Sequence, residues 1–129
     1  MGIPEEILGQ IVEREQPLLE LYRQLAESAQ GEAHRKLTRE LLEQRTFHWN
    51  TLGFLRSQLP REFLCLGTIT DSQVNLRRSP KGSSELLSQL DRGTTVIIIS
   101  YEGNWGQVQL LDGTTGYVFK AYLKCGRGG

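Results

Sequence analysis

The chain of 129 residues has no long apolar run and no excess of charge of either sign. A membrane-spanning helix needs about 20 consecutive apolar residues, and the sequence holds no such stretch. Fifteen Lys and Arg residues balance fifteen Asp and Glu residues, and neither half carries the basic surplus of a nucleic-acid-binding domain. The sequence therefore predicts neither a membrane nor a nucleic-acid partner.

The sequence also lacks the motifs of common enzymes. It has no Gly-x-Ser-x-Gly nucleophile elbow and no glycine-rich phosphate loop before a helix. The only histidines are His34 and His48, in a region of helical pattern, whereas Cys65 lies at the start of a predicted strand. A cysteine nucleophile needs a base within reach, so we interpret the chain as non-enzymatic and expect no cofactor.

No targeting segment is visible at the start of the sequence. The first six residues are acidic and helix-like, not a basic segment followed by an apolar one. If the chain is complete, this predicts a cytoplasmic protein. If the chain is truncated, the cell envelope is the alternative.

The first half has helical spacing. Pro4 followed by two glutamates is a typical helix start, and apolar residues then recur every three or four positions up to Ala29. Pro17 predicts a kink or a restart of this helix. A second helix is predicted from Glu32 to about Leu59, because proline follows.

The second helix has an apolar arc wider than one partner helix can cover. Two helices are also too thin a layer to form a domain alone. The remaining cover must come from the β half of the same chain, from another chain, or from both. We predict a homodimer in which two hairpins form a four-helix bundle as the simplest solution, and the barrel folding back over one flank is the alternative. The residues expected at this interface are apolar. Leu52 lies in the main stripe of the helix, and the others flank it: Leu42, Phe47, Trp49 and Phe54.

The hairpin also resembles one half of a ferritin-like or rubrerythrin-like bundle, through Glu20–Glu27 and Phe47-His48-Trp49. Those proteins hold two metals with a Glu on one helix and a Glu-x-x-His on the next. Here Arg45 stands three positions before His48, and its positive charge would repel a metal. We expect no metal, and a core histidine hydrogen-bonded to Gln44 or to a facing polar group.

The second half changes to short β-rich runs that end in turn residues, at Leu86–Leu90, Thr94–Tyr101 and Trp105–Leu111. Such runs at near-regular spacing are typical of a small barrel or sandwich. Asp112-Gly113 between two alternating runs predicts a hairpin.

This half resembles the bacterial SH3-like (SH3b) domain. The resemblance rests on matching segments in the family's order, namely Gly67–Thr70, Val74–Arg77, Pro80, Arg92–Val96, Asn104-Trp105, Gln107–Gly113, Gly116–Val118 and Tyr122-Leu123. It implies a five- or six-stranded barrel from about Leu66 to Leu123. Ser79 replaces the usual glycine before proline and Tyr117 the usual tryptophan, and the latter change alters a candidate ligand-facing ring.

Aromatic residues at strand ends and loops of this barrel are the best candidates for a shallow peptide-binding groove. Basic residues in the first long loop are candidates for binding a carboxylate or an acidic stretch. Trp105 has the alternative of half-buried core, and the two arginines that of a solvated loop. The candidate ligand-binding residues are Tyr101, Trp105, Tyr117, Tyr122, Arg77 and Arg78.

Cys65 and Cys125 bracket the β region. The first and last strands of an SH3-like barrel usually lie close together, so the resemblance implies that these residues are neighbours. An oxidising compartment would allow a disulfide, whereas the cytoplasm would keep both reduced. The missing leader favours the second reading, in which they are two unrelated small apolar residues.

Together these observations predict an α+β chain with a helical hairpin in residues 1–62 and an SH3-like barrel in residues 63–129. The predicted function is a non-catalytic binding or scaffold module that binds a peptide or protein. The alternative is a cell-envelope targeting module that binds peptidoglycan stem peptides.

Overall fold

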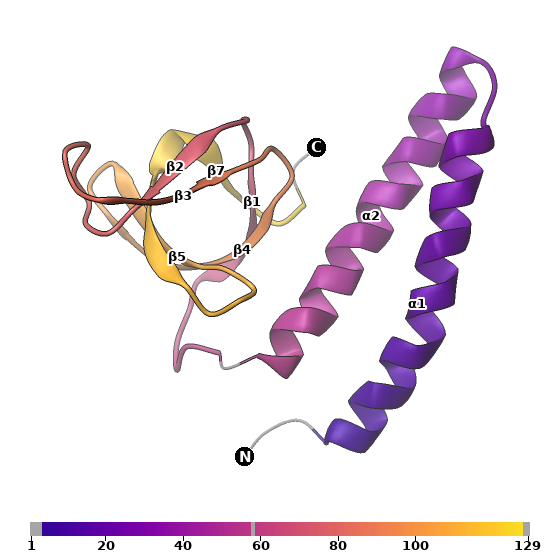
Figure 1. The fold of residues 1–129 in the computed structure, drawn as a ribbon, viewed down its shortest axis with the longest axis horizontal. Coiled ribbons are helices and arrows are strands. Elements are labelled where there is room, and N and C mark those ends of the chain that lie inside the picture. The colour runs from indigo at the N-terminus through magenta and orange to yellow at the C-terminus, as the bar shows by residue number, and fades with distance from the viewer. Residues whose placement is uncertain (1–3, 58, 128–129) are drawn as a thin grey trace. The chain divides into compact units, whose positions relative to one another are not determined.

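The computed structural model describes residues 4–57 and 59–127. The chain divides into two compact units, a helical unit that ends at Arg56 and a β unit that begins at Ser57. Figure 1 shows two long helices followed by a strongly curved sheet. The predicted α+β class, with an N-terminal helical hairpin and a C-terminal SH3-like domain, is confirmed.

Helix α1 spans Glu5–Ser28. Pro4 precedes it and glutamates occupy its first turn, where the negative charge meets free backbone N–H groups. The helix continues through Pro17 without a restart, and the kink predicted as the other possibility stays a prediction. Pro17 and Glu13 are both exposed, and water can therefore bond the Glu13 carbonyl that loses its N–H partner.

Helix α2 spans Glu32–Arg56 and does not reach Leu59, where the sequence predicted its end. Pro60 accounts for Leu59 lying outside the helix, because a proline disfavours the helical conformation of the residue before it. Between the two helices Gly31 has a φ of +84°, which lets the chain turn back sharply.

Polar contacts join the two helices in the middle of the hairpin. The Glu15 carboxylate lies 3.7 Å from the Arg45 guanidinium and 3.5 Å from His48 Nε2. The Arg45 guanidinium also lies 5.2 Å from the ring centre of Tyr22. The polar group that faces His48 is thus Glu15. The His48 side chain is 46% exposed, so the prediction of a core histidine was wrong.

The five residues predicted for a dimer interface differ in exposure. Leu52 and Phe54 are buried, whereas Leu42, Phe47 and Trp49 are partly buried. Self-association through these five side chains stays a prediction.

The β unit is one antiparallel sheet of seven strands in the order β3-β2-β6-β5-β4-β1-β7. The sequence predicted five or six strands and so did not account for all seven. The strand β7 has only three residues and shows no alternation by which the sequence could have indicated it. The strands are β1 Cys65–Ile69, β2 Val74–Arg77, β3 Leu86–Leu90, β4 Thr95–Glu102, β5 Trp105–Gln109, β6 Thr115–Phe119 and β7 Leu123–Cys125, with a 3-10 turn η1 at Lys120–Tyr122.

One face of the curved sheet encloses the hydrophobic core. Val108 on β5 and Val118 on β6 are fully buried. On β6 the residues on either side of Val118 are partly buried or exposed, whereas on β5 Gln109 beside Val108 is buried as well. The alternation on β6 follows from the two-residue period of a strand. The core residues are Ile69, Val74, Leu76, Leu90, Val96, Ile98, Val108 and Val118.

Cys65 and Cys125 form a disulfide across the edge pair β1–β7. The prediction that they are close neighbours is confirmed, with Cα atoms 5.9 Å apart, whereas the favoured reading of two unpaired thiols was wrong. The pairing of β1 with β7, which the sequence did not show, brings the two sulfur atoms together. β7 is also held by the Gly126 N–H, which donates to the Leu66 carbonyl at 2.7 Å.

The Asp112-Gly113 turn joins β5 and β6 as a hairpin, which confirms that prediction. The Asp112 carboxylate accepts a hydrogen bond of 2.9 Å from the Thr114 backbone N–H. This bond, together with one from the Thr114 hydroxyl, holds the pKa of the Asp112 carboxyl below its usual value.

Candidate functional site

Three rings form a cluster on the outer side of the β unit. Trp105 and Phe119 are paired residues of β5 and β6, and their ring planes meet at 87° with centroids 5.6 Å apart. Phe119 also contacts Tyr122 of η1, at 6.1 Å between centroids and 53° between planes. Edge-to-face and tilted contacts are favourable for aromatic rings. These three residues, called here the aromatic cluster, are Trp105, Phe119 and Tyr122, and they form an apolar surface outside the hydrophobic core.

The aromatic cluster borders a groove of about 320 Å³. Its other sides come from the loop before β2, from β2 itself and from the long loop after it. The lining residues outside the cluster are Asp71, Ser72, Gln73, Val74, Asn75, Arg77 and Gly82. The lining of the groove therefore combines aromatic rings with polar and charged groups, as the lining of sites for extended peptides does.

The loop before β2 has a fixed and unusual backbone. Gln73 has a φ of +53°, a conformation that costs energy for a residue with a side chain. Beside it the Asp71 carboxylate accepts the Ser72 N–H at 2.8 Å and lies 3.4 Å from the Arg92 guanidinium. These contacts set one acidic group at the edge of the groove.

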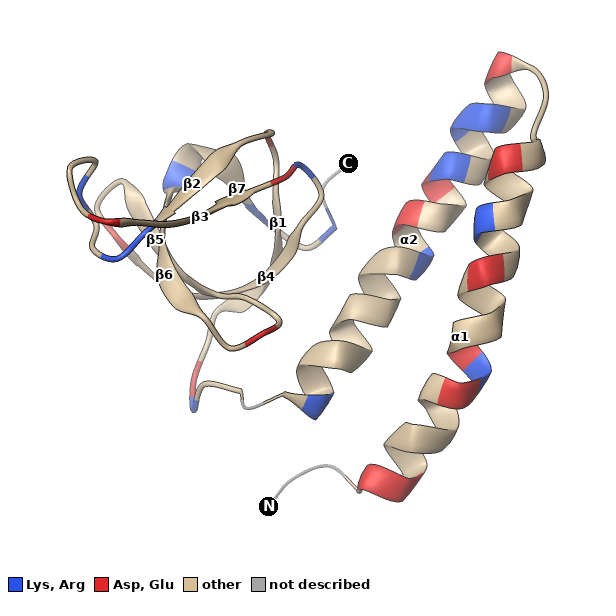
Figure 2. Ribbon diagram, viewed as in Figure 1, with Lys and Arg blue, Asp and Glu red and all other residues tan. Residues whose placement is uncertain are grey.

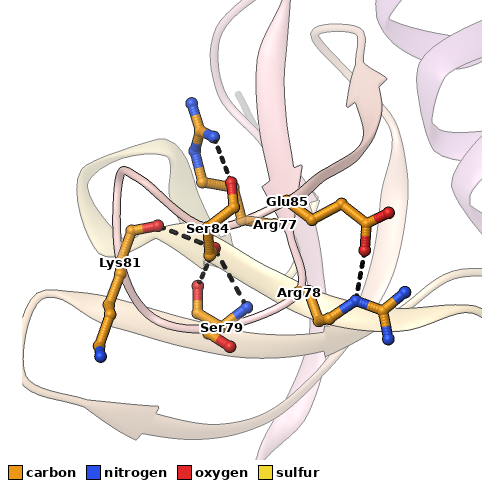
Figure 3. Close-up of polar contacts among 6 residues, drawn as sticks. All are labelled: Arg77, Arg78, Ser79, Lys81, Ser84 and Glu85. Carbon is orange, nitrogen blue, oxygen red and sulfur yellow. Dashed lines mark hydrogen bonds and ion pairs between the residues drawn. The ribbon is translucent and has the colours of Figure 1, made fainter.

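Arg77 supplies the basic group of the groove. It pairs with Tyr117 across β2 and β6, and its guanidinium donates a hydrogen bond of 2.9 Å to the Ser84 carbonyl (Figure 3). One bond leaves most of the five guanidinium N–H donors. Arg77 is therefore able to hold the loop and to bind a carboxylate at the same time.

The loop after β2 is organised by Ser84. Its hydroxyl lies 3.0 and 2.9 Å from the carbonyl oxygens of Ser79 and Lys81, which share its one proton, and it accepts the Ser79 N–H at 3.3 Å (Figure 3). These bonds form a turn within residues 79–84. Arg78 points to Glu85 and forms an ion pair with it.

The structure brings together three of the six predicted ligand-binding residues. Trp105, Tyr122 and Arg77 line the groove. Tyr117, Tyr101 and Arg78 do not line it. The ring of Tyr101 instead lies 5.0 Å from the Lys120 ammonium.

Sequence reasoning missed Phe119, Asp71 and Gln73 as groove residues. Phe119 was within reach, because it follows Tyr117 by two positions and a strand repeats its outward face at that period. The other two lie in a turn, where no period applies. Their place depends on the strand that follows.

The hairpin was also considered as a metal site. Across residues 4–57 and 59–127 the structure shows no group of three or more His, Cys, Asp or Glu side chains placed to hold a metal ion. Arg45 instead occupies the space beside Glu15 and His48. Within those same residues, neither helix has the length and apolarity needed to cross a bilayer.

Comparison with known proteins supports the resemblance of the β unit and not that of the hairpin. No curated protein matches the chain. The match to a protein family lies outside the helices, so nothing supports a ferritin-like relationship. Residues 72–124 match the family described as the bacterial SH3 domain, and this segment contains the aromatic cluster and all of the groove except Asp71.

Proposed function

We propose that the β unit is a non-catalytic binding module and that its groove takes an extended peptide. The observation that carries this proposal is the groove itself, whose lining combines the aromatic cluster with Asp71 and Arg77. Rings supply contact area at low entropic cost. The two charged groups give an extended chain a direction, since one attracts an amine and the other a carboxylate. Bacterial SH3 domains as a class support a binding role.

A peptide array probed with the full chain tests the proposal, with Trp105→Ala as the diagnostic variant. Removing a central ring of a binding surface typically costs about 2 kcal/mol or more, or about 30-fold in affinity. Leu111→Ala is the control, because Leu111 is exposed and does not line the groove. Equal binding by Trp105→Ala and Leu111→Ala, or no peptide bound by the wild type, would contradict the groove assignment.

The second candidate is a cell-envelope module that binds peptidoglycan stem peptides. The disulfide Cys65–Cys125 favours it, because disulfides persist mainly in oxidising compartments. Cosedimentation of the purified chain with isolated peptidoglycan separates the two candidates. Pelleting of the wild type but not of Trp105→Ala supports the envelope role. If the wild type does not pellet, the ligand is a peptide of the kind that the array identifies, and the envelope role is contradicted.

We also propose that the helical hairpin mediates self-association. The support is its thinness, since two helices cannot bury all of their apolar residues against each other. Several large apolar side chains of α1 and α2 remain exposed. Sedimentation equilibrium of the full chain at micromolar concentration tests this, and a monomer mass would contradict it.

A further inference from the structure

One face of the hairpin is apolar and exposed. On α1, Ile7, Ile11 and Leu25 are exposed and Leu18 is partly buried. At about 100° per residue these four lie within about 40° of one another. The side of α1 that contacts α2, marked by Glu15, is about 70° away. This apolar stripe is therefore distinct from the surface that α1 uses inside the hairpin.

Helix α2 carries a matching stripe. Leu37 and Leu41 are exposed, Leu37 by 65%. The less exposed side of α2, with Leu42, Arg45 and Trp49, is rotated from them by about 90°. Further along the helix the exposed polar residues Gln44 and His48 lie at the angle of the two leucines, so the apolar stripe of α2 is confined to its first half. On both helices, the rotation from the stripe to the contact side runs in the same direction about the helix axis, towards larger angles at 100° per residue.

The equal sense of rotation places both stripes on one face. An antiparallel helix pair has a near two-fold axis normal to the plane of the pair. The axis maps one helix onto the other and does not change the side of the plane. Two stripes that are rotated from the contact side in the same direction about their own helices therefore lie on the same side of the plane of the pair. The face, called here the apolar hairpin face, consists of Ile7, Ile11, Leu18, Leu25, Leu37 and Leu41. The opposite side of α1 is polar and exposed, with Gln16, Glu20 and Glu27.

We propose that the apolar hairpin face binds the same face of a second copy of this chain, with α1 of one copy over α2 of the other. This proposal rests on the self-association proposed above and names its surface, which differs from the residues predicted from the sequence. Four helices then enclose both stripes, as in an antiparallel four-helix bundle.

Charge selects this pairing of helices. α1 holds six glutamates against two arginines, whereas α2 holds three glutamates against five Lys and Arg residues. Figure 2 shows the red segments along α1 and the blue segments towards the start of α2. Placing α1 over α2 brings opposite net charges together, whereas α1 over α1 would oppose like charges. A dimer two-fold axis parallel to the helices places α1 of one copy over α2 of the other. The same axis makes all neighbouring helices antiparallel.

Leu25→Glu in the full chain tests the face. Leu25 is 47% exposed, so the substitution does not bury a charge in the monomer. We expect it to raise the dimer dissociation constant, measured by sedimentation equilibrium, by at least about tenfold. Leu111→Glu is the matched control, because it makes the same chemical change at a residue 45% exposed in the β unit; it should leave the dissociation constant unchanged. Far-UV circular dichroism checks that Leu25→Glu keeps its helix content.

The outcomes separate the face from self-association itself. A wild-type monomer overturns both proposals. A dimer that survives Leu25→Glu and Ile11→Glu but dissociates with Leu42→Glu overturns the apolar hairpin face and leaves self-association standing. If Leu25→Glu is monomeric while Leu111→Glu stays dimeric, the result supports the apolar hairpin face as the dimer interface.

Discussion

Trp105 and Phe119 lie opposite each other on β5 and β6, with ring planes at 87°. Outward residues of paired strands share one side of the sheet, so this register builds the floor of the groove from two strands. Each ring supports the other, and Tyr122 extends the surface from η1. The site therefore depends on the strand register as much as on the identity of the rings.

The close approach of β6 to β2 predicts a cost for a side chain at Gly116. An added Cβ would lie 2.8 Å from Leu76 Cδ1 and 2.9 Å from the Arg77 backbone oxygen. Because the backbone cannot yield as a side chain can, we expect Gly116→Ala to lower the free energy of unfolding by about 1–3 kcal/mol in urea denaturation. Gly82→Ala is the control, since nothing lies within 4 Å of its added Cβ. Equal stability of the two variants would show that the sheet yields at this point.

The disulfide predicts a stability that depends on reductant. Cys65 and Cys125 are separated by 60 positions, and closing a loop of this length stabilises a fold by about 4 kcal/mol in the chain-entropy estimate. Cys65→Ser/Cys125→Ser should therefore unfold at lower denaturant concentration than the oxidised wild type. Adding reductant should shift the wild type to the midpoint of the variant and leave the variant itself unmoved. A wild-type midpoint that is insensitive to reductant would argue against the bond.

The Asp112 turn predicts an acid-dependent loss of stability. Hydrogen bonds from Thr114 lower the pKa of the folded carboxyl below 3.8, so the ionised form favours the folded state. This contribution is complete above the unfolded pKa and is lost as the pH falls through the folded value. In urea titrations below about pH 4, Asp112→Asn should show less acid destabilisation than the wild type. Thr114→Val keeps the backbone N–H, which is the main cause of the shift, and should keep most of the wild-type pH dependence; a profile like that of Asp112→Asn would contradict this.

Gln73 predicts a stabilising glycine substitution. Its φ of +53° costs a residue with a Cβ about 1 kcal/mol relative to glycine. Gln73→Ala removes the side chain but keeps the backbone cost, and is the proper reference. We expect Gln73→Gly to exceed Gln73→Ala in free energy of unfolding by about 1 kcal/mol. Thermal and urea unfolding measure this difference, and a less stable glycine variant would mean that the loop conformation is not strained.

The sequence alone determined the class of each half, because hydrophobic period is a local property. Helical spacing up to Pro60 and alternation after it predicted the hairpin and the sheet, and Asp112-Gly113 predicted the turn between β5 and β6. Trp105 and Tyr122 were candidates as aromatic residues of strand ends and loops, and Arg77 as a basic residue of the first long loop. All three line the groove, and their role in binding stays a prediction.

Only the tertiary structure decided which residues meet. Pairing of β1 with β7 joins Cys65 to Cys125, which no local pattern shows. The position of the loop before β2 puts Asp71 and Gln73 beside the aromatic cluster. On the hairpin, the contacts of Glu15 fix how the helices face each other, and that rotation divides the wide apolar arc into a covered side and an exposed one. Periodicity gives each residue an angle on its own helix or strand, but the partner at that angle is set by register and rotation between elements.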